Sequence, residues 1–192
     1  LIVPEVNIQD LSILKKQSES SEGRLISCSN CTVSPIAITL SPLMQIADIT
    51  SVRIFTQQAL SGGGRILLAE GRAGRQINSE IPGEAESIIT ELAKILSCDF
   101  DIEASCERVM RDHGHYARIE VEFGEPISAH QVVRAWRESY SRSQELNLPS
   151  ATKRPIIFVD GELDDNHRWV GFEQHKHPGL DLKAAMLSLI HI

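Results

Sequence analysis

The segment YARIEVEFG, residues 116–124, alternates apolar and polar side chains over most of its length. Alternation with a period of two puts the apolar residues on one face of a β-strand and the charged residues on the other. The apolar set is Ala117, Ile119, Val121 and Phe123. A chain with such a strand must build a sheet that has one buried face and one face in solvent, which favours helices packed on a single side.

Three segments carry the helical periodicity that such a cover requires. Residues 34–47, 83–96 and 128–140 each repeat apolar side chains at a spacing of three or four. Two glutamates open the second segment, where they suit the positive end of the helix dipole. Ser128 and Gln131 predict a capping box at the start of the third. The expected apolar stripe of this third helix is Val132, Val133, Trp136 and Tyr140.

Strand-like segments occur between these helices. Residues 51–60 alternate apolar and polar side chains, and residues 24–30 and 154–159 are short runs rich in β-forming residues. Strands and helices therefore follow one another in mixed order along the chain. The predicted fold class is α/β (α+β), with a mixed, largely antiparallel sheet and helices on one face.

The overall composition excludes several classes of protein. The formal net charge of −7 argues against a nucleic-acid-binding face, because proteins that bind phosphate backbones concentrate Lys and Arg. No apolar run approaches the roughly 20 residues that span a bilayer, so no membrane partner is expected. The first residues, LIVPEVN, lack the basic start of a signal peptide. Four cysteines are too few for a disulfide framework, which favours the cytoplasm.

Cys31, in SNCTVSP, admits three interpretations from the residues alone. It is a small buried thiol, one half of a Cys-x-x-Cys pair with Cys28, or a nucleophile at the start of the helix over 34–47. In the third case, free N–H groups at the helix N-terminus favour the thiolate. No metal site is expected, because Cys98, Cys106 and the histidines near 113 lack the spacing of zinc ligands.

Arg108 and His115 lie seven residues apart, just before the clearest strand. A histidine at a strand entrance can serve as a general acid or base, although an exposed loop histidine is the commoner outcome. The Gly-rich SGGGR, residues 61–65, could bind an anion through its backbone amides. It is not a Walker A loop, and the chain has no G-x-G-x-x-G between a strand and a helix, so no nucleotide-binding fingerprint is present.

Together, a set of ordered motifs resembles the aspartate-semialdehyde dehydrogenase family. The resemblance covers most of residues 1–160 and includes the family's cysteine motif and its Gly-His element. The matching segments are VPEVN (3–7), NCTVS (30–34), TQQALSGGG (56–64), GEAESIITELAKIL (83–96), CERV (106–109), GH (114–115) and LPSATKRP (148–155).

The resemblance implies an NADPH-dependent reduction of aspartyl-4-phosphate to aspartate-4-semialdehyde through a cysteine thioacyl intermediate, a step of lysine, threonine and methionine biosynthesis. It implies catalytic roles for Cys31 as nucleophile, His115 as acid and base, and Gln58. By the same resemblance, Arg108, Glu84 and Asn30 bind the substrate, and Ser61 and Gly62 contact the cofactor.

The resemblance also predicts a domain organisation. The family's NADP-binding domain precedes the first residue here, so NADP is expected to bind mainly to residues absent from this chain. Residues 1–30 would be an edge of that domain, and residues 31–192 the catalytic and dimerisation domain, truncated at its C-terminus. Family members form homodimers or homotetramers through this domain, so an exposed apolar sheet face is expected.

One departure from the family pattern leaves alternatives open. Ser87 stands where the family has a phosphate-binding lysine, so another cation, Arg65, Arg72 or Arg75, would have to take its place. The alternatives are a non-catalytic dimerisation module derived from the family, and an enzyme like N-acetyl-glutamyl-phosphate reductase. The latter's cysteine motif usually continues with Tyr, whereas Thr32 stands here.

Overall fold

The computed structural model describes residues 1–20, 23–148, 151, 153–159 and 185–187. Its helices are α1 (Pro4–Asn7), α2 (Ile13–Ser20), α3 (Val33–Met44), α4 (Gly64–Arg72), α5 (Glu84–Leu96), α6 (Ala129–Glu138) and α7 (Arg142–Glu145), with the 3-10 turns η1 (Ile8–Ser12) and η2 (Leu60–Gly63). The strands are β1 (Ile49–Gln58), β2 (Asp101–Arg108), β3 (Tyr116–Phe123), β4 (Ile156–Phe158) and β5 (Ala185–Leu187).

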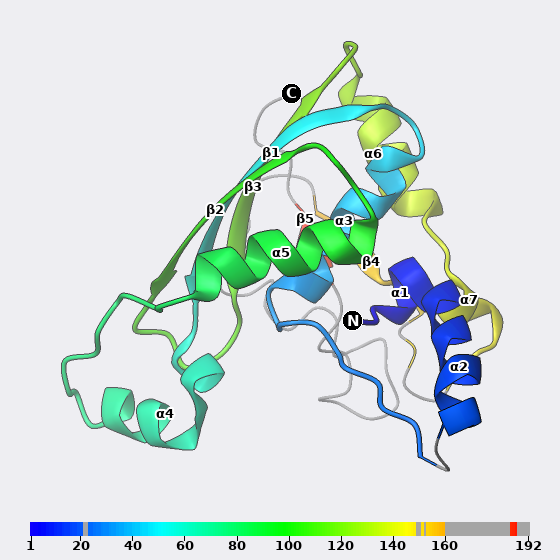
Figure 1. The fold of residues 1–192 in the computed structure, drawn as a ribbon. Coiled ribbons are helices and arrows are strands. Elements are labelled where there is room, and N and C mark those ends of the chain that lie inside the picture. Colours follow the sequence, from blue (N-terminus) through cyan, green and yellow to red (C-terminus); the bar gives the residue numbers. More distant parts are fainter. Residues whose placement is uncertain (21–22, 149–150, 152, 160–184, 188–192) are drawn as a thin grey trace.

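Three long strands form the central sheet in the order β2–β1–β3 (Figure 1). β1 runs parallel to β2 and antiparallel to β3, and Val52 lies opposite both Ile102 and Val121. The prediction of a mixed sheet is confirmed. The described strands are not largely antiparallel, however, because β4 and β5 also pair in parallel. The chain between β1 and β2 holds α4 and α5, and such a long crossover lets the two strands run in the same direction.

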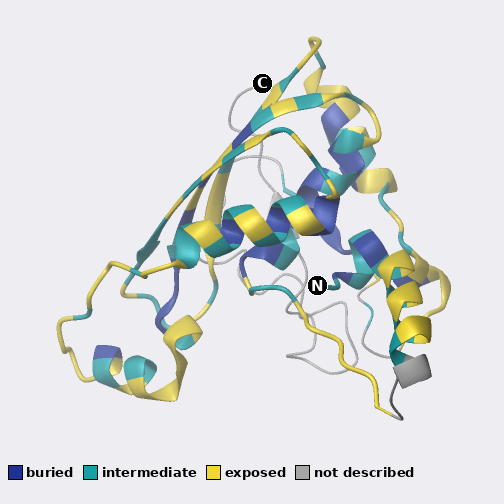
Figure 2. Ribbon diagram, in the orientation of Figure 1, coloured by how far each residue is buried: buried dark blue, intermediate teal, exposed yellow. Residues whose placement is uncertain are grey.

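The hydrophobic core lies between one face of this sheet and helices α3, α5 and α6 (Figure 2). Helix α3 is buried along most of its length, with Ile36 and Leu40 fully enclosed. The indole Nε1 of Trp136 on α6 donates to the Thr39 carbonyl of α3 at 3.1 Å, which joins these two helices inside the core. The predicted capping box of α6 is present at Ser128. Helices on one face of the sheet are therefore confirmed.

The opposite face of the sheet carries charge. Arg53 on β1 forms ion pairs with Glu120 at 3.1 Å and Glu122 at 2.8 Å on β3. Gln57 donates to Glu107 on β2 at 2.8 Å. The expectation of an exposed apolar sheet face is therefore wrong. The alternation that buries one set of side chains leaves these strands with a second set that is mostly charged or polar.

Several elements were not predicted from the sequence, among them β2, α4 and the short helices α1, α2 and α7. Strand β2 alternates Ile102, Ala104 and Cys106 with polar residues, which is a strand pattern. It was not predicted, because only the CERV motif at its end was considered. Helix α4 lies between glycine-rich stretches that predict turns. It projects away from the rest of the fold beyond one end of the sheet (Figure 1), and its Ile66 is 79% exposed.

Two predicted features are absent or shorter than expected. Residues 24–30 do not form a regular strand, since their pairing is a single parallel bridge between Cys28 and Ile2. Helix α6 ends at Glu138, so Tyr140 falls outside the apolar stripe and is exposed. The strand predicted over 154–159 is present as β4.

The first residues pack on the same core as the rest of the chain. Val3 is buried within it, and its N–H donates to Asn7 Oδ1 at 2.8 Å. The domain boundary at residue 30 and the truncation of the C-terminal domain stay predictions. None of the helices among the described residues is long and apolar enough to cross a membrane.

Candidate active site

The sheet topology brings the predicted site residues to the same end of the three strands. Gln58 ends β1 and Arg108 ends the parallel strand β2, and these two residues face each other in the register. β3 runs the other way, so its start, just after His115, lies at the same end. Asn30 and Cys31 precede α3, and Glu84 is the first residue of α5. Carboxyl ends of parallel strands and helix N-termini meet here, as at many ligand sites of α/β folds.

Cys31 and His115 form the reactive pair of this site. The Sγ atom of Cys31 lies 3.3 Å from Nε2 of His115, although 84 residues separate them in the sequence. Both side chains reach solvent. A thiol beside an imidazole is an arrangement of nucleophilic catalysis, so this contact gives the site a defined chemistry.

The pKa of the Cys31 thiol is raised above its ordinary value. Partial burial is the main cause, and the nearby Glu84 carboxylate adds to it. The main-chain N–H groups of Cys31 and Thr32 and the Arg108 guanidinium act in the opposite direction without reversing the shift. The expectation that the N-terminus of α3 favours the thiolate is thus outweighed by desolvation and by Glu84.

The pKa of His115 is lowered from its ordinary value. Partial burial is again the first cause, and the positive charge of Arg108 is the second, while Glu84 opposes them. The Nδ1 atom of the ring accepts a hydrogen bond from the Ala59 N–H at 3.1 Å. Burial and Arg108 therefore favour the neutral imidazole, and both ring nitrogens have hydrogen-bond partners.

A network of amides and carboxylates forms the other side of the site. Asn30 Nδ2 donates to Glu84 Oε1 at 3.0 Å, and Gln58 Nε2 donates to the same oxygen. The N–H of Asn30 donates to Glu91 Oε2 at 2.7 Å. Asn30 Oδ1 accepts from both N–H and Oγ1 of Thr32, each at 2.9 Å. Among the described residues, Glu84 Oε2 accepts no hydrogen bond, so it can receive a further donor.

Arg108 is fixed by the main chain rather than by a carboxylate. Its Nη1 donates to the Ala59 carbonyl at 2.8 Å. In the described part of the chain no ion pair forms at Arg108, so its remaining N–H donors can meet an anion. A planar guanidinium held in this way suits a carboxylate or a phosphate group.

Ser61 and Gly62 lie in the turn η2 beside this site. The Ser61 N–H donates to the Asp112 carbonyl at 3.0 Å, and the Gly62 N–H to the Ala59 carbonyl at 3.0 Å. The N–H of Leu60 is also engaged, with Arg111. These three amides already have acceptors, so they are not free to bind the phosphates of a dinucleotide cofactor. The assignment of Ser61 and Gly62 to cofactor binding stays a prediction.

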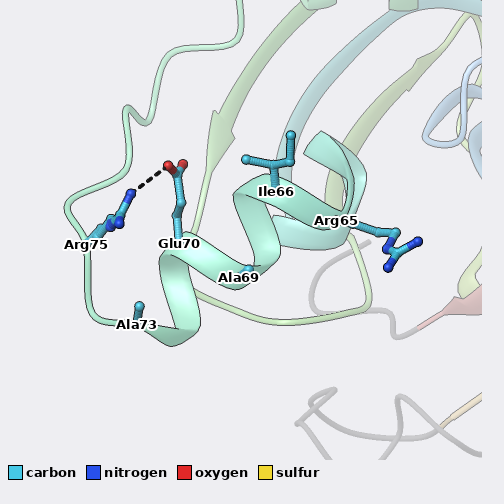
Figure 3. Close-up of a pocket in the computed structure, with 6 residues that line it drawn as sticks. All are labelled: Arg65, Ile66, Ala69, Glu70, Ala73 and Arg75. Carbon is cyan, nitrogen blue, oxygen red and sulfur yellow. Dashed lines mark hydrogen bonds and ion pairs between the residues drawn. The ribbon is translucent and has the colours of Figure 1, made fainter.

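Arg65, Arg72 and Arg75, the three candidates to replace the lysine missing at Ser87, differ in their ion pairs. Arg72 pairs with Asp112 at 2.8 Å, and Arg75 pairs with Glu70 at 3.0 Å. Figure 3 shows Arg75 reaching Glu70 at one end of α4 while Arg65 extends from the other end. Within the described residues Arg65 forms no ion pair, whereas the pairs of Arg72 and Arg75 are exposed and can be exchanged for an anion. The same part of the chain contains no cluster of three potential metal ligands.

Two contributors to the site were not predicted from the sequence. Ala59 supplies its N–H to His115 and its carbonyl to Arg108. No side-chain pattern signals such a main-chain contact. Glu91 holds the Asn30 N–H, and its position could have been found. It follows Glu84 by seven residues, two helical turns, so both carboxylates share one face of α5.

Comparison with known proteins identifies relatives of this arrangement. No protein-family profile matches the chain. A malonyl CoA reductase (NADP) from Metallosphaera sedula is 26% identical, and the match covers all of this chain and 57% of that protein. An aspartate-semialdehyde dehydrogenase from Aspergillus fumigatus is 31% identical over 83% of this chain and 49% of that protein.

Solved structures agree with these sequence matches. The aspartate-semialdehyde dehydrogenase with NADP from Candida albicans superposes with a TM-score of 0.68 at 25% identity, over 83% of this chain and 50% of that one. The chain spans about half the length of the curated relatives it matches. It belongs to the aspartate-semialdehyde dehydrogenase family.

Proposed function

We propose that this chain carries the substrate-binding and catalytic residues of an NADPH-dependent aspartate-semialdehyde dehydrogenase. The observation that carries the proposal is the 3.3 Å contact between Cys31 Sγ and His115 Nε2. Arg108 and Glu84 lie close enough to both groups to shift their pKa values. A nucleophile, a proton donor, a cation and an anion in one place match an aspartyl substrate, which has an acyl group, a carboxylate and an ammonium.

Substrate recognition follows from the charges. Arg108 binds the α-carboxylate with the N–H donors that Ala59 does not use. Glu84 binds the α-ammonium through Oε2, while Asn30 and Gln58 hold its other oxygen in place. Because this carboxylate is oriented in advance, little order has to be gained when the substrate binds.

The acyl transfer uses the thiolate of Cys31. Its sulfur attacks the carbonyl carbon of aspartyl-4-phosphate, a C–S bond forms, the C–O bond to phosphate breaks, and inorganic phosphate leaves. NADPH, bound by parts of the protein outside the described residues, supplies the hydride that reduces the thioester. His115 gives a proton to the oxygen of the tetrahedral adduct, and takes it back when the C–S bond breaks to release the aldehyde.

A malonyl-CoA reductase is the second candidate, since the relative with that name matches the entire chain. It would use the same cysteine on a thioester, with CoA in place of phosphate as the leaving group. Ser87 favours this candidate. A thioester has no acyl phosphate, so its reaction does not need the phosphate-binding lysine that Ser87 replaces. Glu84 favours the aspartyl substrate, because neither a malonyl group nor the N-acetylated substrate of N-acetyl-glutamyl-phosphate reductase has an ammonium.

The proposal extends to the setting of the enzyme. A homodimer or homotetramer would have to use polar contacts if it forms through the outer face of the sheet, since that face is charged. Cys28, Cys31, Cys98 and Cys106 are all free thiols, which supports a reducing cytoplasm. The last part of the proposal is that residues 1–30 form an edge of the nucleotide-binding domain.

Activity assays with two substrates test this function. The protein, expressed from its complete coding sequence, should oxidise aspartate semialdehyde with NADP⁺ only when phosphate is present, and the Cys31→Ser variant should not. The matched control is Cys28→Ser, which should keep the activity. Activity with malonyl-CoA alone would replace the first candidate by the second. A protein without Cys31-dependent activity on either substrate would be the non-catalytic module.

A further inference from the structure

The turn that joins β1 to α4 contacts both His115, the partner of the reactive thiol, and Arg108 through its main chain. The Ala59 N–H donates to His115 Nδ1 at 3.1 Å, and the Ala59 carbonyl accepts from Arg108 Nη1 at 2.8 Å. Ala59 is fully buried, and η2 is tied to the 109–112 loop by main-chain hydrogen bonds. A single peptide segment thus holds the imidazole and the guanidinium.

The Ala59 contact determines which nitrogen of His115 carries the proton. A main-chain N–H can only donate, so Nδ1 must present its lone pair. A neutral imidazole with an unprotonated Nδ1 carries its hydrogen on Nε2. Nε2 is the nitrogen that lies 3.3 Å from Cys31 Sγ. The hydrogen bond between them therefore runs from the ring to the sulfur.

Gly62 allows this turn to approach both side chains. A Cβ atom added at Gly62 would lie 2.9 Å from Arg108 Nη1 and 3.0 Å from His115 Cε1. Separations that short force one of these groups to move. Gly62 has no backbone torsion that would demand glycine, so close approach alone accounts for the residue.

We propose that the main chain of the Ala59–Gly62 turn is a positioning element, which fixes His115 as the neutral Nε2–H tautomer and holds Arg108 beside it. The inference rests on the proposed function and refines the part that His115 takes in it. A ring of this tautomer cannot accept the thiol proton at Nε2. The proton of Cys31 therefore leaves to solvent. His115 acts through its Nε2–H as a hydrogen-bond donor to the sulfur and to the substrate oxygen, in place of the proton transfer of the proposed function.

Nitrogen NMR of the histidine rings tests the tautomer without any substrate. The protein, expressed from its complete coding sequence with ¹⁵N-histidine, contains seven histidines within this chain, and His115→Asn identifies the signals of His115. At pH 7 we expect a protonated Nε2 and an unprotonated Nδ1. A proton on Nδ1, or an imidazolium with both nitrogens protonated, would overturn the proposal. Because the readout needs no turnover, it can fail while the proposed function stands, and the reverse.

The Gly62→Ala variant tests the turn, and Gly124→Ala is its matched control. At Gly124 an added Cβ meets its nearest atom at 3.7 Å, an ordinary contact, and the backbone torsion suits alanine. We expect Gly62→Ala to mix the His115 tautomers, to lower kcat at least tenfold and to raise the KM for the substrate. Gly124→Ala should change none of these. A Gly62→Ala protein with the wild-type tautomer and kinetics would overturn the proposal. If that variant does not fold, the wild-type spectrum still decides it.

Discussion

Cys31 and His115 are the open side of the site, whereas Asn30, Gln58 and Glu84 form a closed network on the other side. The open pair reaches solvent, and its contact with the remaining structure is largely through main-chain atoms. In the closed network, Gln58 is only 2% exposed, and both amides converge on one carboxylate oxygen.

The difference separates reaction from recognition. Groups that must exchange protons and form a covalent bond need access, and their titration can be tuned only by neighbours. Groups that bind a charged ligand bind it more tightly when their orientation is fixed before the ligand arrives. Burial fixes that orientation, but a buried group that loses its hydrogen-bond partner lowers the free energy of unfolding. Substitutions on the open side should therefore change activity much more than stability, whereas those in the network should change both.

The largest effect is expected at Cys31. Cys31→Ser should lower the turnover of the aldehyde dehydrogenase reaction at least about a thousandfold, because the covalent route is lost. Its thermal unfolding temperature should stay unchanged, since the side chain is exposed. Steady-state kinetics and calorimetry on the same preparation measure both. A large fall in unfolding temperature would contradict the separation of the two sides.

Gln58 tests the closed network through stability. Gln58→Ala removes a buried amide and leaves Glu84 without one of its donors, so the free energy of unfolding should fall by about 2 kcal/mol or more. The neighbouring Gln57→Ala is the matched control. Gln57 lies on the same strand but on the outer face, so its loss should cost under about 1 kcal/mol. Urea unfolding of both variants checks this, and equal losses would mean that the network adds nothing.

The fold was predicted from sequence wherever one period dominated. The segments that became α3, α5 and α6 repeat apolar residues at helical spacing, and those that became β1 and β3 alternate. The relative direction of β1 and β2 was not predicted, because their parallel pairing depends on the crossover through α4 and α5. Helix α4 itself was not predicted, because it lies between glycines that predict turns. Local patterns state which face of a strand is buried, not which strand lies beside it.

The site was predicted from a family resemblance more than from its own chemistry. By residue type alone, Cys31 was most simply a small buried thiol, whereas it is exposed, and its pairing with His115 spans 84 residues. The role of Ala59 has no sequence signal, since main-chain atoms are the same in every residue. The residues that could be predicted carry distinctive side chains, and those that were missed act through the backbone or through helix geometry.

The pH dependence of the alkylation rate at Cys31 should reflect the raised pKa of its thiol. With the pKa above its usual range, the alkylation rate at neutral pH should be several-fold lower than that of the same residue in urea-unfolded protein. The rate should then rise about tenfold per pH unit past the pH at which the unfolded chain levels off. Iodoacetamide labelling in a Cys28→Ser background, located by mass spectrometry, measures both curves. Coincident curves would show that burial and Glu84 do not act on the thiol.

The smallest expected effect is on the acid side of the stability curve, at His115. Its pKa is lowered in the folded protein, by burial first and by Arg108 second, so the unfolded chain binds a proton at a higher pH than the folded chain does. The free energy of unfolding should therefore fall as the pH drops below about 6.5, the ordinary histidine value. Because solvent reaches the ring and screens its charge, the contribution should be under about 1 kcal/mol. Urea midpoints at a series of pH values, for the wild type and His115→Asn, isolate it, since the variant lacks the titrating ring and should lose less stability in acid. An identical acid slope in both proteins would mean that His115 titrates alike in the folded and unfolded states, and that the open side of the site lacks the electrostatic coupling assigned to it.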